Sequence, residues 1–365
     1  MWNNHFVFSA DAHIMEPGDL FTGNLPQKLR SRGVVTEREG DYIITRAGDL
    51  LLERLRRPVS IGDMDGREKR GVRDLRGRLA DMELDGVDAE LLFPSLAIAT
   101  FKISDVELER ETAKVYNDWL IDHVRDHRDK LVPNAVLPVH DFKETVAELT
   151  RVAKLGYKSV MLPCWMPEGV PEYNSEEWDP VFEHAGELGL VFAMHTGTGL
   201  DRVVRERGPG GAIINYSSQM LDAQHSIMYM VAGGVLDRHP KAAVAAIECG
   251  ASWLGALAER MDEVNAAHHM FVRPKLSRKP SEIIAQQVKA TFQTDRECVI
   301  ARRITGHQAV MWGADYPHAE GTFPDSRTVL NGIFQGVDIS DDEVADIVGR
   351  TAARFFGLRN PALAA

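Results

Sequence analysis

A chain of 365 residues with a formal net charge of −12 lacks the basic surface that nucleic acids require. Its three cysteines are odd in number and widely spaced, which argues against a disulfide framework and against a thiolate zinc site. No apolar run reaches the roughly 18 residues of a membrane span, and no signal-peptide pattern is present. We therefore expect a cytoplasmic protein without a membrane partner.

An anionic substrate would need a local basic patch on so acidic a chain. The arginine-rich stretch 54–78 is the candidate for this patch, although a solvated surface is its simpler explanation.

Short apolar segments alternate with helical periodicity along the chain. The predicted strands are 6–12, 89–94, 133–139, 157–163, 189–195, 242–248, 290–294 and 309–315, and the predicted helices are 105–129, 142–155, 175–188, 216–238, 251–270 and 279–289. Most strands are continuously hydrophobic, which is typical of parallel strands buried on both faces. This pattern predicts an α/β fold, a (β/α)8 TIM barrel formed by one domain over residues 1–365. A doubly wound sheet is the alternative, but its glycine-rich phosphate fingerprint is missing after the first strand.

Two segments depart from this alternation. Residues 20–85 form an insertion after the first strand, and they contain the pattern of a β-hairpin that turns at residues 39–41. We expect this insertion to lie over the barrel mouth. The predicted helix 216–238 would be about 34 Å long at 1.5 Å per residue, so its first half should project above the barrel rim.

Side chains that can bind a metal collect at the ends of four predicted strands. Asp11 and His13 end the first strand, and His195, Glu248 and Asp315 each end a later one. In a barrel the carboxyl ends of the strands meet at one face, where active sites lie. One such residue alone is explained by hydrogen bonding or by capping of the next helix. Three carboxylates buried near one axis would repel each other strongly without a cation, so together they predict a metal site.

Three further residues are candidates at this face. Glu16 could act in catalysis by orienting His13, or it could cap the following turn. His318, close behind Asp315, could bind substrate or transfer a proton, or it could be structural. His225 lies midway along the long predicted helix, which would bring it level with the barrel mouth as a further metal ligand.

These residues lie in segments that resemble the metal-dependent amidohydrolase superfamily, in its branch around aminocarboxymuconate-semialdehyde decarboxylase. The segments DAHIMEP, FAMHTG, GGVLDRHPKAAVAAIECGASW and WGADYPH follow in the right order across nearly the whole chain. Asp11 stands where the superfamily commonly has the first histidine of a His-x-His pair, and Glu248 stands where a catalytic histidine is common. Strand 157–163 ends in Pro163-Cys164, so the carboxylated lysine of some binuclear members has no counterpart.

With these carboxylates, the chain looks most like a smaller branch with the same barrel, the nonheme diiron monooxygenases of platensimycin and platencin biosynthesis. A mixture of carboxylate and imidazole ligands suits iron or manganese better than zinc. The resemblance implies oxidoreductase chemistry in secondary metabolism: two iron ions use O2 to hydroxylate a bulky apolar substrate, a diterpenoid linked to coenzyme A. The implied ligands are Asp11, His13, His195, His225, Glu248 and Asp315.

A second hypothesis keeps a single zinc or manganese ion in a hydrolase or a nonoxidative decarboxylase, with Glu248 or His318 as general base. A third is a binding protein without catalysis, in which Asp315 would be dispensable. Candidate pocket residues are Phe93, Phe101, Trp165, Met166, Met228, Met230 and Phe323. We also expect a homodimer, with helices 251–270 and 142–155 as its contact face.

Overall fold

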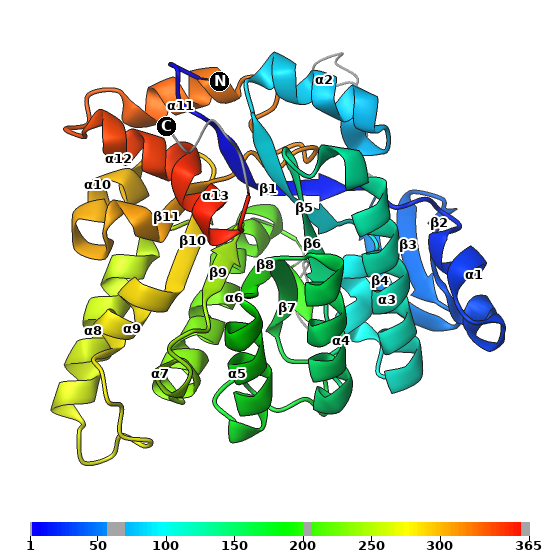
Figure 1. Cartoon of the computed structure of the whole chain (residues 1–365), viewed down its shortest axis with the longest axis horizontal. Helices are drawn as coiled ribbons and strands as arrows, with labels where there is room; N and C mark the ends of the chain where they lie inside the picture. The colour runs from blue at the N-terminus through cyan, green and yellow to red at the C-terminus, as the bar shows by residue number, and fades with distance from the viewer. Residues whose placement is uncertain (1, 57–69, 200–205, 207, 359–365) are drawn as a thin grey trace.

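Eight parallel strands form the central sheet of the computed structural model, which describes residues 2–56, 70–199, 206 and 208–358 (Figure 1). Their order is β1-β5-β6-β7-β8-β9-β10-β11. The strands are β1 (Phe8–Ile14), β5 (Ala89–Pro94), β6 (Leu131–Val136), β7 (Ser159–Trp165), β8 (Val191–Gly199), β9 (Val244–Ile247), β10 (Val288–Phe292) and β11 (Val310–Trp312). Every residue of β1, β5 and β6 is buried, which explains the continuous apolar runs.

The two ends of this sheet meet just after β11. The amide of Asp315 donates to the carbonyl of Asp11 (2.9 Å), and the amide of His13 donates to the carbonyl of Tyr316 (2.6 Å). Ala12 forms a parallel bridge with Tyr316. The sheet is therefore nearly closed, and the predicted (β/α)8 barrel is confirmed.

Helices surround the strands on the outside of the barrel (Figure 1). They are α1 (Leu20–Asn24), α2 (Leu75–Asp85), α3 (Val106–His123), α4 (Phe142–Leu155), α5 (Asp179–Leu188), α6 (Gly211–Ala232), α7 (Val235–Arg238), α8 (Trp253–Ala267), α9 (Pro280–Gln287), α10 (Arg296–Thr305), α11 (Ser326–Phe334), α12 (Asp341–Ala345) and α13 (Thr351–Phe355). Local signals set their ends. In α4, the carboxylate of Asp141 accepts the amide of Lys143 at the start, and Gly156 at φ 93° ends the helix.

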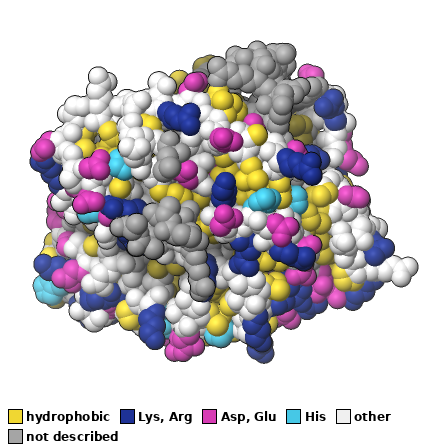
Figure 2. Space-filling view, turned by 45° about the horizontal axis from the view of Figure 1, so that its top comes forward, with side chains coloured by type: hydrophobic (Ala, Val, Ile, Leu, Met, Phe, Trp, Pro, Cys, Tyr) yellow, Lys and Arg dark blue, Asp and Glu magenta, His cyan; other side chains and the backbone are white. Residues whose placement is uncertain are grey.

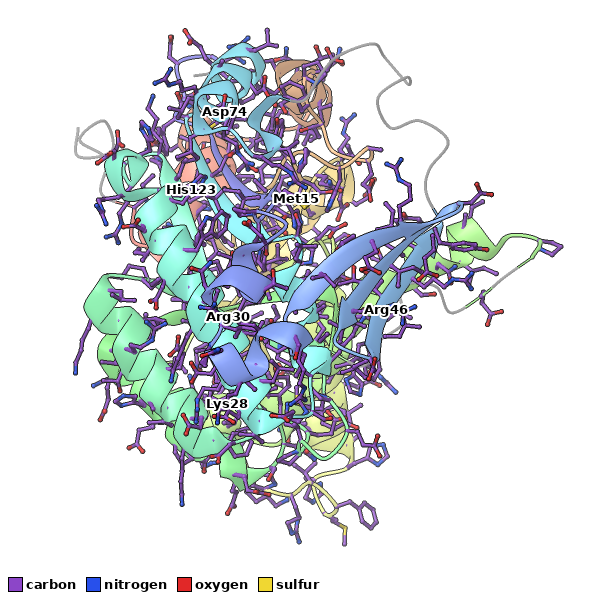
Figure 3. All side chains as sticks on the ribbon, turned by 90° about the vertical axis from the view of Figure 1, so that its right-hand side faces the viewer. Met15, Lys28, Arg30, Arg46, Asp74 and His123 are labelled. Atoms are coloured by element: carbon purple, nitrogen blue, oxygen red, sulfur yellow. The ribbon has the colours of Figure 1, made fainter. Side chains whose placement is uncertain are left out.

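The insertion after β1 contains a three-stranded antiparallel sheet. Its strands are β2 (Val34–Glu39), β3 (Tyr42–Ala47) and β4 (Leu50–Arg56), and Glu39 pairs with Tyr42 across the predicted turn. The hairpin is confirmed, and β4 adds a strand that the sequence analysis did not predict. The sheet projects on the right of Figure 3, and the light-green start of α6 reaches the same side.

The arginine-rich stretch gives little support for an anion-binding patch. Residues 57–69, half of it, lie outside the described residues. Arg54 lies over the ring of Tyr42 (3.8 Å to the centroid), and Arg78 is fully buried. On the face in Figure 2, lysine and arginine side chains are scattered among acidic ones. The described part therefore gives no support to an anion-binding patch, and Arg78 is a buried residue rather than part of a solvated surface.

The long predicted helix is present with shifted bounds. α6 begins at Gly211 rather than 216, because the side-chain amide of Asn215 exchanges two hydrogen bonds with the backbone of Glu206 and holds the first turns. It ends at Ala232, where Gly233 and Gly234 separate it from α7. Neither α6 nor any other described helix is long and apolar enough to cross a membrane.

Candidate metal centre

Five of the six predicted metal ligands converge at the carboxyl ends of the strands. Three overlapping groups each bring their potential ligand atoms within 4.8 Å of one another. The groups are Asp11–His13–His195, His13–Asp315–His318 and Asp11–Glu248–Asp315. Because they share members, they form one cluster, which we call the metal cluster.

Two of the three imidazoles of this cluster point at each other. Nε2 of His13 lies 3.0 Å from Nε2 of His195. Nδ1 of His195 lies 2.8 Å from the carbonyl of Thr196, and Nδ1 of His13 lies 3.3 Å from the carbonyl of Pro94. A carbonyl only accepts, so each neutral ring carries its hydrogen on Nδ1 and turns the lone pair of Nε2 toward the other ring. Facing lone pairs repel unless a cation or a proton lies between them, as in a metal site.

Three of the four carboxylate oxygens of Asp11 and Asp315 lack a hydrogen-bond partner among the described residues. Both oxygens of Asp11 and Oδ2 of Asp315 are buried without one. Asp11 Oδ1 lies 3.8 Å from Nε2 of His13 and 3.6 Å from Nε2 of His195, and Asp315 Oδ1 lies 3.5 Å from Nε2 of His13. Buried carboxylates without partners are costly, and a divalent cation would satisfy them. These oxygen and nitrogen donors fit manganese, iron or zinc.

Protons take the place of a cation when no metal is bound. Burial alone would lower the pKa of His195, but the adjacent Asp11 carboxylate outweighs it and raises that pKa to about 10. Burial lowers the pKa of His13 well below its usual value. Glu248 Oε2 lies 3.3 Å from Nε2 of His195, and burial, together with the charge of Asp315, raises the pKa of Glu248 to about 8. The cluster therefore attracts positive charge strongly.

His318 joins the cluster at its solvent side. Its Nδ1 lies 2.8 Å from Asp315 Oδ1, and its ring centroid lies 4.3 Å from that of His13. Burial would lower the pKa of His318, but Asp315 outweighs it and raises the pKa to about 9. Its side chain is 41% exposed. His318 is therefore a cation at neutral pH that reaches both solvent and the cluster.

His225 does not join the metal cluster. Its ring is stacked on Trp165 (4.0 Å between centroids) and packs against Tyr229 (4.4 Å). It belongs to none of the three ligand groups. The geometry therefore gives no support to His225 as a sixth ligand. Helical periodicity assigns a residue to a face, but it does not fix which way that face is turned.

Glu16 binds backbone rather than the cluster. Its buried carboxylate accepts the amides of Ser95, Leu96 and Ala97 at 2.8 to 3.2 Å. These amides directly follow Pro94, whose carbonyl faces His13. Glu16 therefore fixes the chain after β5, and it reaches His13 only through the carbonyl of Pro94.

A buried arginine behind His13 escaped the sequence analysis. Nη1 of Arg78 donates to the carbonyl of His13 (2.6 Å), and its Nε donates to Glu90 (2.6 Å). Both charged side chains are almost fully buried. The signal was Glu90, a carboxylate inside an apolar strand, which requires a buried cation as its partner.

The predicted pocket residues separate into several environments. Phe93 packs against both imidazoles, with ring centroids 6.1 Å from His13 and 5.0 Å from His195. Phe101 is fully buried, whereas Met228 is exposed. Only Phe93 among these has a direct ring contact with the metal cluster.

Comparisons with known proteins agree with this architecture. A family model described as Amidohydrolase matches residues 13–358. An amidohydrolase from Mycobacterium avium subsp. paratuberculosis K-10 aligns with a TM-score of 0.78 at 19% identity, over 97% of this chain and 100% of that one. A 5-carboxyvanillate decarboxylase from Sphingomonas paucimobilis aligns with a TM-score of 0.73 at 21% identity, over 98% of this chain and 100% of that one. A dihydroxybenzoic acid decarboxylase from Polaromonas sp. JS666 aligns with a TM-score of 0.66 at 20% identity, over 98% of this chain and 99% of that one. That structure was solved with manganese and the inhibitor 2-nitroresorcinol.

These findings correct the predicted monooxygenase function. The family model that matches residues 13–358 is described as Amidohydrolase, and the three solved structures named above are an amidohydrolase and two decarboxylases, so the comparisons give no support to a diiron enzyme that uses O2. The geometry agrees, because His225, needed to complete the implied set of ligands for two irons, is stacked on aromatic rings outside the cluster. Since the family model spans nearly the whole chain, this protein belongs to the amidohydrolase family of metal-dependent enzymes.

Proposed function

We propose that this protein is a nonoxidative decarboxylase that uses one divalent metal ion held by Asp11, His13, His195 and Asp315. The observation that carries the proposal is the convergence of two imidazole Nε2 atoms and two buried carboxylates, three of whose four oxygens have no hydrogen-bond partner among the described residues. Manganese bound to the similar dihydroxybenzoic acid decarboxylase supports the choice of ion. Aromatic carboxylates are the proposed substrate class, because two of the similar structures carry such substrates in their names.

The metal would act as a Lewis acid that orients and polarises the substrate. Decarboxylation replaces a carbon–carboxylate bond with a carbon–hydrogen bond, so the site must also deliver a proton to carbon. Glu248 belongs to the cluster, and without a metal ion its pKa is raised to about 8, so this carboxyl group binds a proton readily. We assign it as proton donor. His318, cationic and partly exposed, would bind the anionic end of the substrate and exchange protons with solvent.

Hydrolysis is the second candidate, and the family description favours it. A hydrolase would need Glu248 without its proton, so that its carboxylate could take a proton from the attacking water. The two reactions differ in their product, because only decarboxylation releases CO2.

The decisive experiment measures CO2 release without O2 and metal content in the same preparation. Manganese-loaded protein is incubated anaerobically with 5-carboxyvanillate, 2,6-dihydroxybenzoate and related aromatic carboxylates. We expect one metal ion per chain and CO2 release that a chelator abolishes and manganese restores. Asp11→Ala and His13→Ala should lose metal and activity while keeping the native circular dichroism spectrum. Asp141→Ala, at the start of α4, should keep both. A requirement for O2, or activity that persists without metal, would refute the proposal.

A further inference from the structure

The start of α6 lies over the mouth of the metal cluster. The hydroxyl of Thr196, at the carboxyl end of β8, donates to the carbonyl of Gln219 (3.1 Å). The terminal methyl of Met220 lies 3.8 Å from the point where a Cβ on Gly250, just after β9, would stand. These contacts hold the middle of α6 above the ends of two strands that supply the cluster. The turns before residue 219 continue beyond them, on the side to which the sheet β2–β4 also projects (Figure 3).

Three uncharged side chains form a stripe on this overhanging part of the helix. Ile213, Tyr216 and Met220 are spaced three and four residues apart, so they share one face. Ile213 is 76% exposed and Tyr216 is 59% exposed. Both side chains are therefore accessible to a ligand that enters the mouth of the cluster.

Tyr216 is the polar member of the stripe, on the face of α6 that Met220 turns toward Gly250. Among the described residues its hydroxyl has no hydrogen-bond partner. Partial burial, and then the charges of Glu320, Glu248 and Asp315, raise the pKa of Tyr216. Glu248 and Asp315 belong to the cluster, and Glu320 follows it after β11. The ring of Tyr216 therefore stands within electrostatic reach of the cluster.

We infer that Ile213, Tyr216 and Met220 form the wall that determines substrate specificity. The ring of a bound carboxylate would lie against Ile213 and Met220, whose sulfur makes favourable contacts with aromatic edges. The Tyr216 hydroxyl would donate to an oxygen substituent on that ring, away from the carboxylate at the metal. Tyr216 thus selects ring-hydroxylated acids over unsubstituted ones. This inference rests on the proposed function for the orientation of the substrate.

The test compares binding of benzoate with binding of 2-, 3- and 4-hydroxybenzoate to the manganese-loaded protein by calorimetry. We expect at least one hydroxybenzoate to bind more tightly than benzoate. Tyr216→Phe should weaken that hydroxybenzoate about tenfold, the value of one hydrogen bond, and leave benzoate unchanged. Met220→Ala should weaken both ligands. With a turned-over substrate, Tyr216→Phe should raise KM and keep kcat.

Leu221→Ala is the matched control. Leu221 is 51% exposed on the same helix, but it lies about 100° around the helix axis from Met220. Its substitution should therefore change the affinity for neither benzoate nor the hydroxybenzoate. Metal content should stay at the wild-type value in all three variants. Unchanged hydroxybenzoate binding in Tyr216→Phe, equal losses for both ligands in that variant, or no binding of any benzoate would overturn the inference. Failure of the proposed function gives a different result, in which discrimination by Tyr216 persists but no CO2 is released.

Discussion

Two carboxylates of the metal cluster stand on backbone conformations that side chains rarely adopt. Glu248 has φ 57° and Asp315 has φ 53°. Each follows the end of a barrel strand, where the chain turns toward the next helix. A left-handed conformation of this kind costs on the order of 1–3 kcal/mol for a residue with a Cβ, and glycine avoids the cost. The fold accepts this strain at two positions whose carboxylates both join the cluster.

This strain can be measured by comparing Glu248→Gly with Glu248→Gln. Both substitutions remove the carboxyl group, but only glycine relaxes the backbone. We expect metal-free Glu248→Gly to be more stable than Glu248→Gln by about 1 kcal/mol, the strain being offset in part by the greater freedom of glycine in the unfolded chain. Urea unfolding at pH 7 gives the difference. Equal stabilities would mean that the backbone at residue 248 is unstrained. Both variants should be inactive.

The proton on His318 should make stability depend on pH. Its pKa in the folded protein is raised to about 9 from an ordinary value of 6.5, so the folded state holds this proton more tightly. The resulting stabilisation is fully present below pH 6.5 and is lost as the pH rises through 9. Urea unfolding of the metal-free protein measures this effect. The free energy of unfolding of the wild type should exceed that of His318→Asn at pH 6, and this difference should vanish by pH 10. A difference that does not vary with pH would contradict the assignment.

At the scale of elements, the sequence was sufficient where burial alone decides structure. Each barrel strand is apolar because both of its faces are covered, so all eight runs were recognisable. The metal ligands at the strand ends could then be predicted, since parallel strands bring those ends together. Strand β4 was missed because it is partly exposed and runs into arginines. His225 was misplaced because the rotation of α6 depends on contacts such as Asn215 with Glu206, which periodicity does not reveal.

Glu16 links two elements, and its replacement should separate stability from catalysis. Its carboxylate holds the three amides that begin the short 3-10 helix η3 (Ala97–Lys102) and the turn before it. Glu16→Gln keeps the size but weakens these charged hydrogen bonds, so we expect a loss of about 2 kcal/mol in unfolding free energy. Metal content and kcat of the folded variant should stay near wild type. A large loss of kcat with unchanged stability would restore the catalytic role for Glu16.

In the whole molecule, the junction where the barrel closes, which we call the seam, lies at the metal cluster. The first strand and the segment after the last one are joined by the hydrogen bonds of Asp315 to Asp11 and of His13 to Tyr316. The side chains of Asp11 and Asp315 are also members of the cluster, one from each side of the seam. A cation bound by both would therefore connect the two ends of the barrel, so metal binding and barrel closure should be coupled.

This coupling predicts that manganese stabilises the whole molecule and protects the seam in particular. A ligand that binds only the folded state adds about 2.7 kcal/mol to the free energy of unfolding when its concentration is 100 times its Kd. The midpoint temperature of thermal unfolding should therefore rise with manganese concentration. Asp11→Asn should reduce the manganese-induced rise in unfolding temperature. Asp141→Ala should show the full rise, measured from the unfolding temperature of its own metal-free form. Hydrogen exchange should slow most at the amides of His13 and Asp315. If Asp11→Asn kept the full shift, or if the seam amides exchanged at the same rate with and without manganese, the ion would be bound elsewhere, and the seam would close without it.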